Sequence, residues 1–513
     1  MQYEGEQNFE IDMRGSQKSE KDGDTGADDS KKVDSADVDE AGNSERPARR
    51  RKAVGGEGGG ETPSPSGAAA SDKNSGGSEL KDQGTEPDSP LPDIPSEIDL
   101  NHFQEQSLVE LYQLGTDLGL RVGGSRSKHQ LVFDLLQFYG RKGSNIVAEG
   151  VLEAGRDGAG YLRWAAFNFA PTPDSVFVPV NLVRSNGIRQ GNLVRVSLKR
   201  ARDRDKHLCA DEVIAVEGEP IESWEQRKPF DKLTALSPRE RLILEHPDKT
   251  SVGARIVDLI APLGKGQRGL ICAPPRGGKT ILLKDIATSV KMNHPEVELI
   301  VLLLDERPEE VTDFKETVNA SVFSSTFDES PKRHVQVSEI VSERAKRLVE
   351  MGRDVVILLD SLTRLSRGYN SMSGSKGGIG SGGLQKQALE KPRRLFGAAR
   401  NCEEGGSLTI LATALIETES RMDEVIFEEF KGTGNMEIQL DREMVEKRVF
   451  PAIHILKSGT RKDDLLYHPQ EFQRISTLRR QLAQIPAGEA MEVLIRNIHR
   501  TSSNAELLLT GIK

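Results

Sequence analysis

The sequence has little of what marks a secreted or membrane-spanning protein. Among its 513 residues there are only 3 cysteines, Cys209, Cys272 and Cys402, which lie too far apart for a disulfide framework or a zinc motif. The apolar runs at 301–304 and 355–359 are far too short to cross a bilayer. The polar, acidic N-terminal residues show no secretory signal pattern. These absences predict a cytoplasmic protein with reduced cysteines and no membrane contact.

An excess of acidic residues argues, but only in part, against a nucleic-acid partner. The chain has 70 Lys and Arg against 80 Asp and Glu, a net charge of −10, which taken alone disfavours binding to nucleic acid. The charge is unevenly distributed, however. Residues 1–97 form an acidic, Gly/Ser-rich stretch with few apolar side chains, which predicts a disordered tail. The basic cluster 46–52 inside it is interpreted as a solvated charge run, with an auxiliary nucleic-acid contact as the alternative.

The length predicts two or three domains, and the sequence pattern changes at identifiable points. Residues 98–145 have helical apolar spacing, broken by a Gly-rich turn at 122–125, and predict a small helical module. Residues 146–220 hold about five short β-type segments separated by turn signals, which is typical of a small barrel such as an OB-fold. The polar stretch 221–250 predicts a linker. From 251 to 513, apolar strands alternate with helices, which predicts a parallel α/β domain.

The most informative motif is the segment 273–280, Ala-Pro-Pro-Arg-Gly-Gly-Lys-Thr, between a strand-like and a helix-like run. This is the layout of a P-loop. Gly277 and Gly278 let backbone N–H groups approach phosphate oxygens, and the start of the following helix adds unpaired N–H groups. Lys279 would neutralise the β- and γ-phosphates, and the Thr280 hydroxyl would hold Mg²⁺. An alanine in place of the usual first glycine makes the match imperfect, and an ordinary strand–helix turn is the alternative.

Two apolar strands after the P-loop each end in acid, one at Asp305 and Glu306 and the other at Asp360. ATP hydrolysis needs one carboxylate to position Mg²⁺ and another to activate the attacking water. In a parallel sheet both should lie at carboxyl ends of strands, beside the P-loop. The spacing does not decide which acid has which role, nor which basic residue stabilises the transferred phosphoryl group. The basic candidates are the run 264–269, Arg307, Arg448 and Arg461.

A Gly/Ser-rich segment, 371–383, follows the second of these strands. It lacks the side chains to build a core, which predicts a mobile loop. A plain linker is one interpretation. In a ring-shaped ATPase, its Lys376 could instead grip a polymer backbone and move with the state of the nucleotide.

These motifs together resemble the bacterial transcription termination factor Rho family over roughly residues 100–513. Members of that family are hexameric RNA-dependent ATPases and helicases. An Ala-Pro-Pro start of the P-loop is usual among them, so the alanine supports the resemblance. The matching blocks are 264–271, 273–280, 305–312, 358–365, 396–400, 403–409, 422–435, 446–451 and 458–461.

The resemblance assigns catalytic roles that the spacing leaves open. It implies that Glu306 is the base that polarises water, and that Asp360 and Thr280 direct Mg²⁺. It also implies that Arg461 is an arginine finger that reaches the site of a neighbouring subunit, with Arg448 nearby.

The resemblance further implies which residues hold ATP. Arg307 would contact the nucleotide or relay its state, and Phe450 would stack against adenine. Lys279 would act on the phosphates as the P-loop itself predicts. The remaining implied ATP contacts are Gly264, Lys265, Gly266, Gln267, Arg268, Gly269, Arg276, Gly277, Gly278, Thr280 and Ile281.

The barrel would be a primary RNA site, with Tyr161 and Phe177 as stacking platforms worth about 1–3 kcal/mol per base. Simple barrel core is the alternative for both aromatics. The chain has Ala159 where the family commonly has an aromatic, and His207 where tyrosine is more usual. The loss at Ala159 predicts weaker or less selective binding. The implied primary set is Gly158, Ala159, Gly160, Tyr161, Leu162, Arg163, Ser175, Val176, Phe177, Asp205, Lys206 and His207.

A secondary RNA site is implied on two loops of the motor. Arg421 falls on one of them, and Lys376 on the central Gly/Ser-rich loop. The lysine is shifted by a couple of positions from its usual place, so Arg421 is the stronger candidate. The leading helices would add a basic face through Arg121, Arg126, Lys128 and His129.

The resemblance therefore predicts an α/β chain with a RecA-like P-loop motor, preceded by the helical module and the OB-fold barrel. It implies a cytoplasmic homohexamer that binds nascent single-stranded RNA, hydrolyses ATP with Mg²⁺ and dislodges RNA polymerase. One alternative is another RecA-like ring ATPase, such as a rotary synthase or protein-export subunit, which RNA-stimulated ATP turnover would separate. Another is an RNA-binding protein or chaperone that holds ATP as a structural ligand, which the Glu306→Ala variant would separate.

Overall fold

The computed structural model describes residues 94–120, 126–200, 207–247, 251–373, 378, 380–385 and 387–512. Most of the predicted tail, with its basic cluster, lies outside the described residues. So do Lys376, Asp205, Lys206 and Arg121, whose predicted roles remain predictions.

In its described residues, the helical module begins with a short strand and holds three helices. Both longer helices start at capping boxes, in which Ser107 and Ser127 bind the backbone N–H three residues later and the side chain there binds back. The last helix ends at Gly143, whose φ of 99° suits glycine. Leu111, Leu131 and other buried leucines join these helices to the barrel core. The elements are β1 (Glu97–Asp99), α1 (Leu100–Glu105), α2 (Leu108–Asp117) and α3 (Lys128–Lys142).

The next strands form a closed barrel, as predicted. In the described part of this sheet the order is β1-β2-β3-β4-β6-β5, and pairing of β2 with β5 closes the ring. β1 pairs with β2, so the helical module shares the barrel's sheet. The elements are β2 (Asn145–Ala154), β3 (Gly160–Arg163), η1 (Ala165–Phe167), β4 (Val176–Val178), α4 (Val180–Ser185), β5 (Leu193–Leu198), β6 (Leu208–Val216) and β7 (Glu219–Pro220).

The predicted linker at 221–250 is only partly a linker. Phe230 at the 3-10 turn η2 (Phe230–Lys232) is buried in a core cluster of the α/β domain. Strand β8 (Ala235–Leu236) pairs with β13 (Arg400–Cys402), and Leu242 and Leu244 are fully buried. The apolar residues scattered in this polar stretch therefore attach it to the α/β domain from Phe230 onward.

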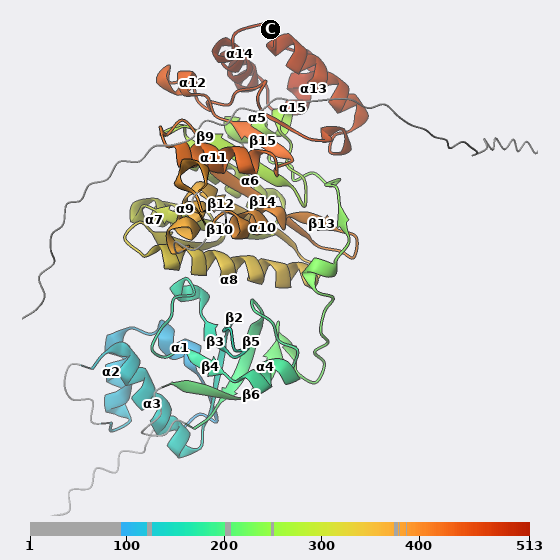
Figure 1. Cartoon of the computed structure of the whole chain (residues 1–513). Helices are drawn as coiled ribbons and strands as arrows, with labels where there is room; N and C mark the ends of the chain where they lie inside the picture. The colour runs from blue at the N-terminus through green and yellow to red at the C-terminus, as the bar shows by residue number, and fades with distance from the viewer. Residues whose placement is uncertain are drawn as a thin grey trace, which may run out of the picture. The chain divides into compact units, whose positions relative to one another are not determined.

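The α/β domain, called the motor below, is built on a mainly parallel sheet (Figure 1). In the described part, the strand order is β11-β10-β12-β14-β9-β15-β16, with only β16 antiparallel along this path. The predicted alternation of strand and helix is confirmed. The strands are β9 (Arg268–Ala273), β10 (Glu298–Glu306), β11 (Ser321–Thr326), β12 (Asp354–Asp360), β14 (Ser407–Leu415), β15 (Met436–Gln439) and β16 (Gly459–Thr460).

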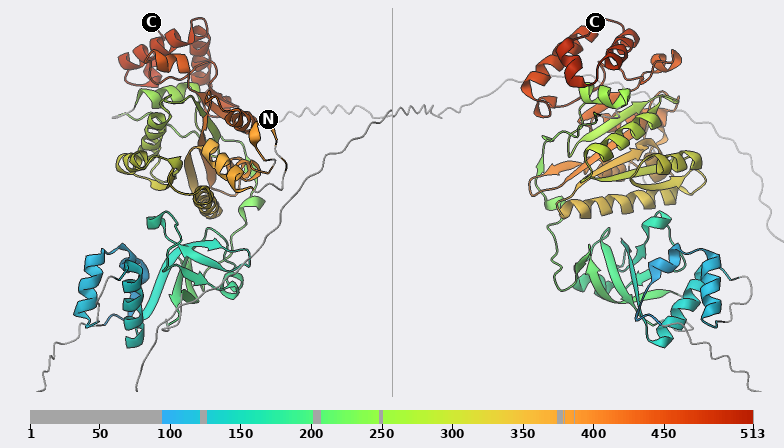
Figure 2. Two further views of the ribbon diagram at one scale, coloured as in Figure 1. Left: turned by 60° about the vertical axis from the view of Figure 1, so that its left-hand side comes forward. Right: turned by 180° about the vertical axis from the view of Figure 1, so that it is seen from behind.

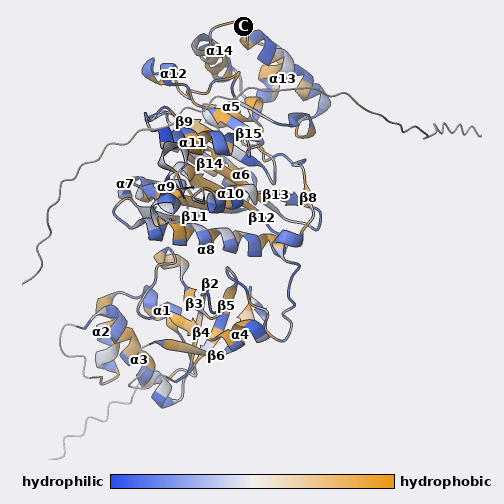
Figure 3. Ribbon diagram, in the orientation of Figure 1, coloured by the Kyte–Doolittle hydropathy of each residue, from blue (hydrophilic) through white to orange (hydrophobic). Residues whose placement is uncertain are grey.

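Two hydrophobic cores lie on the two faces of this sheet. Along β10, Val301 and Leu303 belong to one core, while Ile300, Leu302 and Leu304 belong to the other. Both faces are covered, so the strands read as continuous apolar runs and colour as hydrophobic in Figure 3. Helices α5 (Val252–Ile260), α6 (Lys279–Asn293) and α7 (Pro308–Thr317) contribute to the first core, and α8 (Pro331–Glu350), α9 (Leu362–Met372), α10 (Glu390–Gly397) and α11 (Arg421–Lys431) to the second.

The C-terminal helices pack together against α5, as the red ribbon in Figure 2 shows. Buried Arg255 holds them through hydrogen bonds to the Asn504 side chain and to the carbonyls of Ile498 and Thr501. Within the described residues, no helix has the length and apolar content needed to cross a membrane. The elements are α12 (Arg442–Glu446), η5 (Asp463–Leu465), α13 (Pro469–Leu482), α14 (Ala487–Arg500) and α15 (Asn504–Thr510).

Candidate functional site

The predicted P-loop joins the end of β9 to the start of α6. Arg276 and Gly278 both have positive φ, 64° and 85°, which turns the backbone sharply after the strand. A Cβ on Gly277 would lie 2.9 Å from the Pro274 carbonyl oxygen, so this position has no room for a side chain. Helix α6 begins at Lys279 without a side-chain cap, which leaves its first N–H groups available to an anion.

The predicted acids lie beside this loop. Asp360 ends β12 and Glu306 ends the neighbouring strand β10. The Lys279 ammonium donates to Asp360 Oδ2 at 2.6 Å and lies 3.4 Å from Glu306 Oε2. Burial disfavours the Lys279 cation, but the carboxylates of Asp360 and Glu306 outweigh it and raise its pKa. The lysine therefore bridges the two carboxylates that the sequence predicts for catalysis.

Glu306 and Asp360 have different surroundings. Burial, with the nearby Asp360 carboxylate, raises the pKa of Glu306 to about 7. A carboxyl group with a pKa near neutrality is suited to exchange protons with water. Asp360 is fixed instead: its side chain is 1% exposed, and Oδ1 accepts a hydrogen bond from the Thr413 hydroxyl at 2.7 Å.

Three polar partners of the site were missed by sequence reasoning. Thr413, on β14, holds Asp360. Glu310, on α7, accepts a hydrogen bond from the Thr280 hydroxyl at 3.2 Å. Arg364, on α9, binds Asp305 at 2.9 Å. Thr413 lies at the carboxyl end of a third apolar strand, a signal that could have suggested it.

A second group of predicted residues lines the outer side of the loop. The Phe450 ring lies 3.7 Å from the position that a Cβ on Gly278 would take, and it is 44% exposed. Ile281, in the first turn of α6, is 67% exposed, and Arg307 is exposed at the N-cap of α7. An exposed aromatic and an exposed aliphatic side chain next to a phosphate loop suit the flat face of a nucleobase.

The predicted ATP contacts in the run Gly264 to Gly269 lie elsewhere. They precede and begin β9, while the P-loop follows its other end, about 17 Å away at the usual rise per residue. Lys265 is paired with Glu240 and Asp354, and a Cβ on Gly266 would lie only 2.2 Å from the Asn401 nitrogen. The structure thus does not bring this run to the chain's own P-loop, because its side chains pack the base of the sheet.

The two predicted arginines are also separated. Arg448 precedes Phe450 on the P-loop side, with φ of 61°. The Arg461 backbone N–H donates to the Asn435 carbonyl, at the start of β15 and therefore at the amino end of β9. No interaction between Arg448 and Arg461 is present among the residues that the structure describes, so the expectation that they lie near each other finds no support.

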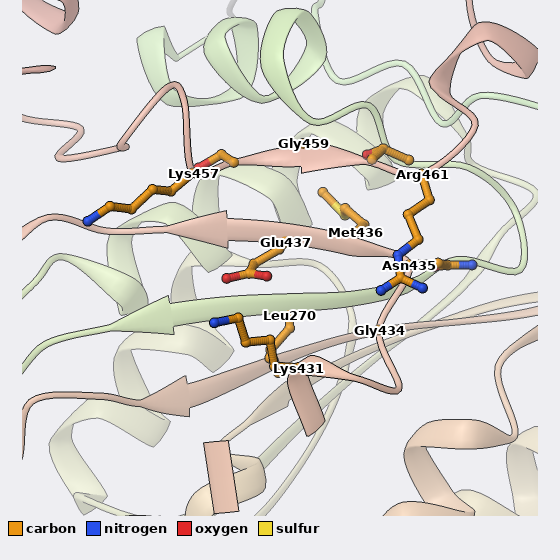
Figure 4. A pocket seen from close by; sticks show the side chains of 11 residues that line it. Leu270, Lys431, Gly434, Asn435, Met436, Glu437, Lys457, Gly459 and Arg461 are labelled. Atoms are coloured by element: carbon orange, nitrogen blue, oxygen red, sulfur yellow. The ribbon is translucent and has the colours of Figure 1, made fainter. Parts of the chain in front are cut away.

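A pocket of about 280 Å³ is lined by Arg461, directly after β16. Lys431, at the end of α11, and Arg461, after β16, reach it from different elements (Figure 4). Lys457 also lines it, and Glu437 supplies a carboxylate. Burial, and then the positive charges of Arg400 and Arg461, lower the pKa of the adjacent Arg268. The pocket is therefore a basic surface remote from the chain's own phosphate loop.

On the barrel, the predicted aromatic pair is present and half-buried. The Tyr161 and Phe177 rings lie 5.4 Å apart at 60°, and the Arg163 guanidinium lies 5.2 Å from the Tyr161 ring. Neither aromatic belongs to the barrel core cluster, which favours the platform interpretation over simple core.

Several other predicted barrel contacts face inward. Leu162 and Val176 are fully buried core residues, because side chains alternate across each strand. Ala159, just before β3, is 4% exposed. Their side chains cannot touch a ligand, so only their backbone is available. Ser175 is buried as well, and its hydroxyl accepts a hydrogen bond from Arg163 at 2.7 Å. Gly158 has φ of 86°, and a Cβ on Gly160 would lie 2.7 Å from the Glu153 carbonyl oxygen, so both positions require glycine. His207, in contrast, is exposed.

The described part of the Gly/Ser-rich segment meets the other predicted RNA loop. The turn η4 (Ser381–Gly383) packs against the start of α11, where a Cβ on Gly382 would lie 2.8 Å from the Arg421 carbonyl. Arg421 itself is exposed. Two segments predicted to touch one polymer thus lie side by side.

Two family models match the chain. The ATP synthase alpha/beta family, nucleotide-binding domain, matches residues 253–460, and the Rho termination factor, RNA-binding domain, matches residues 148–222. The first range covers the sheet of the motor but not its C-terminal helices, and the second covers most of the barrel.

Curated relatives match over most of the chain. The chain is 54% identical over 446 residues to the transcription termination factor Rho of Akkermansia muciniphila, covering 87% of this chain and 93% of that protein. It is 48% identical over 410 residues to the protein of the same name from Aquifex aeolicus, covering 79% and 94%.

Solved structures match at lower similarity. An ATPase of a type III secretion system is 20% identical with a TM-score of 0.47, covering 55% of this chain and 87% of that one. An ATP synthase subunit of Nanoarcheaum equitans is 20% identical with a TM-score of 0.43, covering 52% and 67%.

Proposed function

Because this chain belongs to the transcription termination factor Rho family, we propose that it binds nascent RNA on its barrel and moves along that RNA by hydrolysing ATP in its motor, releasing the transcript from RNA polymerase. The observation that carries the proposal is the presence, in one chain, of a barrel with an aromatic pair beside an arginine and a motor with a P-loop beside two strand-end acids. Such a protein works beside the transcription machinery, in the cytoplasm.

In the motor, the P-loop backbone and Lys279 bind the phosphates of ATP. When phosphate enters, the Lys279 ammonium exchanges its contacts with Asp360 and Glu306 for the β- and γ-oxygens. Loss of that positive neighbour leaves Glu306 a stronger proton acceptor, which suits it to polarise the attacking water. Phe450 and Ile281 contact the adenine ring, and Arg307 lies at the mouth of the same site.

The residues present fit a Mg²⁺ ion. The Thr280 hydroxyl and the Asp360 carboxylate are oxygen donors next to the phosphate site. No cluster of three or more His, Cys, Asp or Glu able to hold a metal occurs among the described residues, which fits an ion that takes most of its ligands from phosphate and water. When bound, Mg²⁺ neutralises developing charge on the phosphates.

Arg461 acts on a second copy of the chain. It lies at the amino end of β9, on a basic pocket remote from its own P-loop. An arginine so placed stabilises a phosphoryl group only if a neighbouring subunit presents its P-loop there, as in a homohexameric ring. Arg448, on the P-loop side, acts within its own site.

RNA contacts two surfaces. Bases stack on Tyr161 and Phe177 while Arg163 attracts the phosphate backbone, which is the primary site. Arg421 and the adjoining Gly/Ser-rich segment hold the RNA at the motor, which is the secondary site.

The test is ATP turnover of the full chain with and without homopolymer RNAs. We expect cytidine-rich single-stranded RNA to raise turnover, and Arg163→Ala to weaken RNA binding without lowering basal turnover. Turnover that ignores every RNA would instead favour a ring ATPase of the rotary or secretion class, which the motor's match to the ATP synthase alpha/beta family would then explain. Basal turnover unchanged in Glu306→Ala would remove Glu306 as the base.

A further inference from the structure

One carboxylate on the barrel is shared between an RNA-binding arginine and the motor. Glu153, near the end of β2, accepts a hydrogen bond from Arg163 Nε on its Oε2 atom at 2.6 Å. Its other oxygen, Oε1, accepts one from Gln336 Nε2 of the motor helix α8 at 2.8 Å. The side chains of Arg163 and Glu153 are 9% and 23% exposed, so the pair is largely removed from water. In such surroundings each contact is stronger than it would be in water.

The network continues from Gln336 into the motor and back to the barrel. Gln336 Oε1 accepts a hydrogen bond from Arg333 Nη1 at 3.0 Å, and Arg333 Nη2 donates to the Asn168 carbonyl of the barrel loop. The Asn168 side-chain oxygen in turn accepts from the Ser324 backbone N–H at 3.2 Å. Ser324 belongs to β11. The hydrogen bonds thus run from Arg163 to a strand of the motor sheet.

The barrel loop that receives these bonds is held in a strained form. Asn168 and Phe169 have φ of 51° and 60°, a region that costs a bulky side chain about 1–3 kcal/mol. Phe169 is 1% exposed and stacks on Phe323 of β11, with ring centroids 4.6 Å apart. Strain at two successive residues persists because the motor contacts over-determine the loop.

The strand that the network reaches is next to the catalytic strand. β11 pairs in parallel with β10, and Ser324 lies opposite Leu303 in that register. β10 ends at Glu306, which pairs with Thr326 at the end of β11. A shift of β11 therefore acts directly on the strand that carries the proposed base.

We infer that Glu153 and Gln336 are positioning residues that transmit occupancy of the barrel by RNA to the ATPase site. The inference rests on the proposed function of Arg163 as an RNA contact. The Arg163 side chain is 9% exposed, and through this exposed part an RNA phosphate competes with Glu153 for the guanidinium. The carboxylate then turns toward its remaining partner, Gln336. That change repositions Arg333 and the Asn168 loop against β11. Neither Glu153 nor Gln336 touches ATP.

The experiment separates RNA affinity from RNA stimulation. Binding of a fluorescent oligocytidylate to the full chain gives the affinity, and ATP turnover across a poly(C) titration gives basal and maximal rates. We expect Gln336→Ala to leave oligocytidylate affinity and basal turnover within about twofold of wild type, and to lower the maximal stimulation by roughly fivefold, in the range that coupling residues span. Lys332→Ala is the matched control, because Lys332 is an exposed residue one turn earlier on α8. Lys332→Ala should leave the affinity, the basal turnover and the maximal stimulation unchanged.

A pair of near-isosteric exchanges keeps the test valid if the alanine variant folds poorly. Gln336→Glu sets two carboxylates face to face and should lower stimulation at least as far as Gln336→Ala. Adding Glu153→Gln restores one amide–carboxylate hydrogen bond between the two positions and should recover part of the stimulation that Gln336→Glu loses.

The outcomes distinguish the inference from the function beneath it. Unchanged stimulation in Gln336→Glu overturns the inference, and so does a loss of stimulation that only follows a loss of affinity, since the network would then merely order the RNA site. Absence of rescue in the exchange also overturns it. An Arg163→Ala variant that keeps full oligocytidylate affinity, or a wild type that poly(C) does not stimulate, instead contradicts the proposed function.

Discussion

The two ends of strand β9 hold opposite electrostatic arrangements. At the carboxyl end, Lys279 is held by two carboxylates of its own chain, Asp360 and Glu306. At the amino end, Arg461 and Lys431 line an open pocket next to Arg268, whose pKa is lowered by burial and by neighbouring arginines. The carboxyl end, called the paired end below, holds its lysine between two carboxylates. At the amino end Lys431 lies 3.7 Å from Glu428, while Arg461 is exposed and forms no ion pair among the described residues.

In a ring ATPase, these two ends would divide one site between two copies of the chain. The paired end must first release Lys279 from Asp360 and Glu306 before the ammonium can bind phosphate. We propose that Arg461 gains its counter-charge when another subunit brings nucleotide to it. We propose that the two ends meet across a subunit boundary and complete one site there.

The largest loss of activity is expected for the Arg461 variant. Replacing this arginine with alanine should lower RNA-stimulated turnover by about 10³-fold or more, as loss of an arginine finger does, while ATP still binds. Turnover and ATP affinity are measured on the assembled protein.

A mixing experiment shows which copy Arg461 serves. Some subunit boundaries in rings mixed from Arg461→Ala chains and Glu306→Gln chains should hold both an intact Arg461 and an intact Glu306. Activity in the mixture above the sum of the two separate variants places the finger in trans. Mixtures that remain as inactive as their parents would mean that Arg461 acts elsewhere.

At the paired end, Glu306→Gln should lower turnover by at least about 10²-fold, the usual contribution of a general base. The glutamine keeps the shape of the side chain but cannot accept the proton of water. Steady-state turnover with saturating RNA checks this. Asp313→Asn, on α7 with the carboxylate exposed, is a control that should keep full turnover.

Retained turnover in Glu306→Gln would shift the role of the base to another acid of the same end. Glu310 is then the next residue to test, since it holds the Thr280 hydroxyl.

The glycines at the amino end of β9 are expected to pack the base of the sheet and not to bind phosphate. Gly266 has φ of 88° and no room for a Cβ, because Asn401 lies 2.2 Å from that position. Gly266→Ala should therefore lower the free energy of unfolding by about 2 kcal/mol through strain and overlap. Chemical denaturation measures the loss.

ATP affinity decides between packing and nucleotide contact at Gly266. If the run Gly264 to Gly269 only packs the base of the sheet, the folded Gly266→Ala protein binds ATP as tightly as wild type does. The outcome that would restore the predicted nucleotide contact is weaker ATP binding with an unchanged unfolding transition.

Much of the fold was predictable because its signals are local. Buried strands of a parallel sheet read as apolar runs, and the barrel's turns carry glycine and proline, so both domains could be placed from the sequence. The predicted linker from Phe230 onward could not be placed, since Phe230 and Leu242 find partners only once the motor has folded.

The site was predictable where chemistry follows directly from a strand end, as at Glu306 and Asp360. It was not predictable where it depends on strand order. Thr413 meets Asp360 because β14 lies beside β12, and Arg461 lies far from the P-loop because β15 runs parallel to β9. Leu162 and Val176 point their side chains into the barrel. This follows from strand alternation once their neighbours Tyr161 and Phe177 are taken to face outward.

The smallest expected effect is on stability at Arg461. This side chain is exposed and repels Arg268, so Arg461→Ala should leave the unfolding free energy of the nucleotide-free protein within about 0.5 kcal/mol of wild type, or raise it slightly. Arg255→Ala is the contrasting control, since that arginine is buried and holds Asn504, Ile498 and Thr501, and its loss should cost at least about 2 kcal/mol. Denaturation of both variants at low protein concentration gives the two values. An Arg461→Ala loss as large as that of Arg255→Ala would mean that Arg461 is already paired within its own chain, and the contrast between the two ends of β9 would no longer hold.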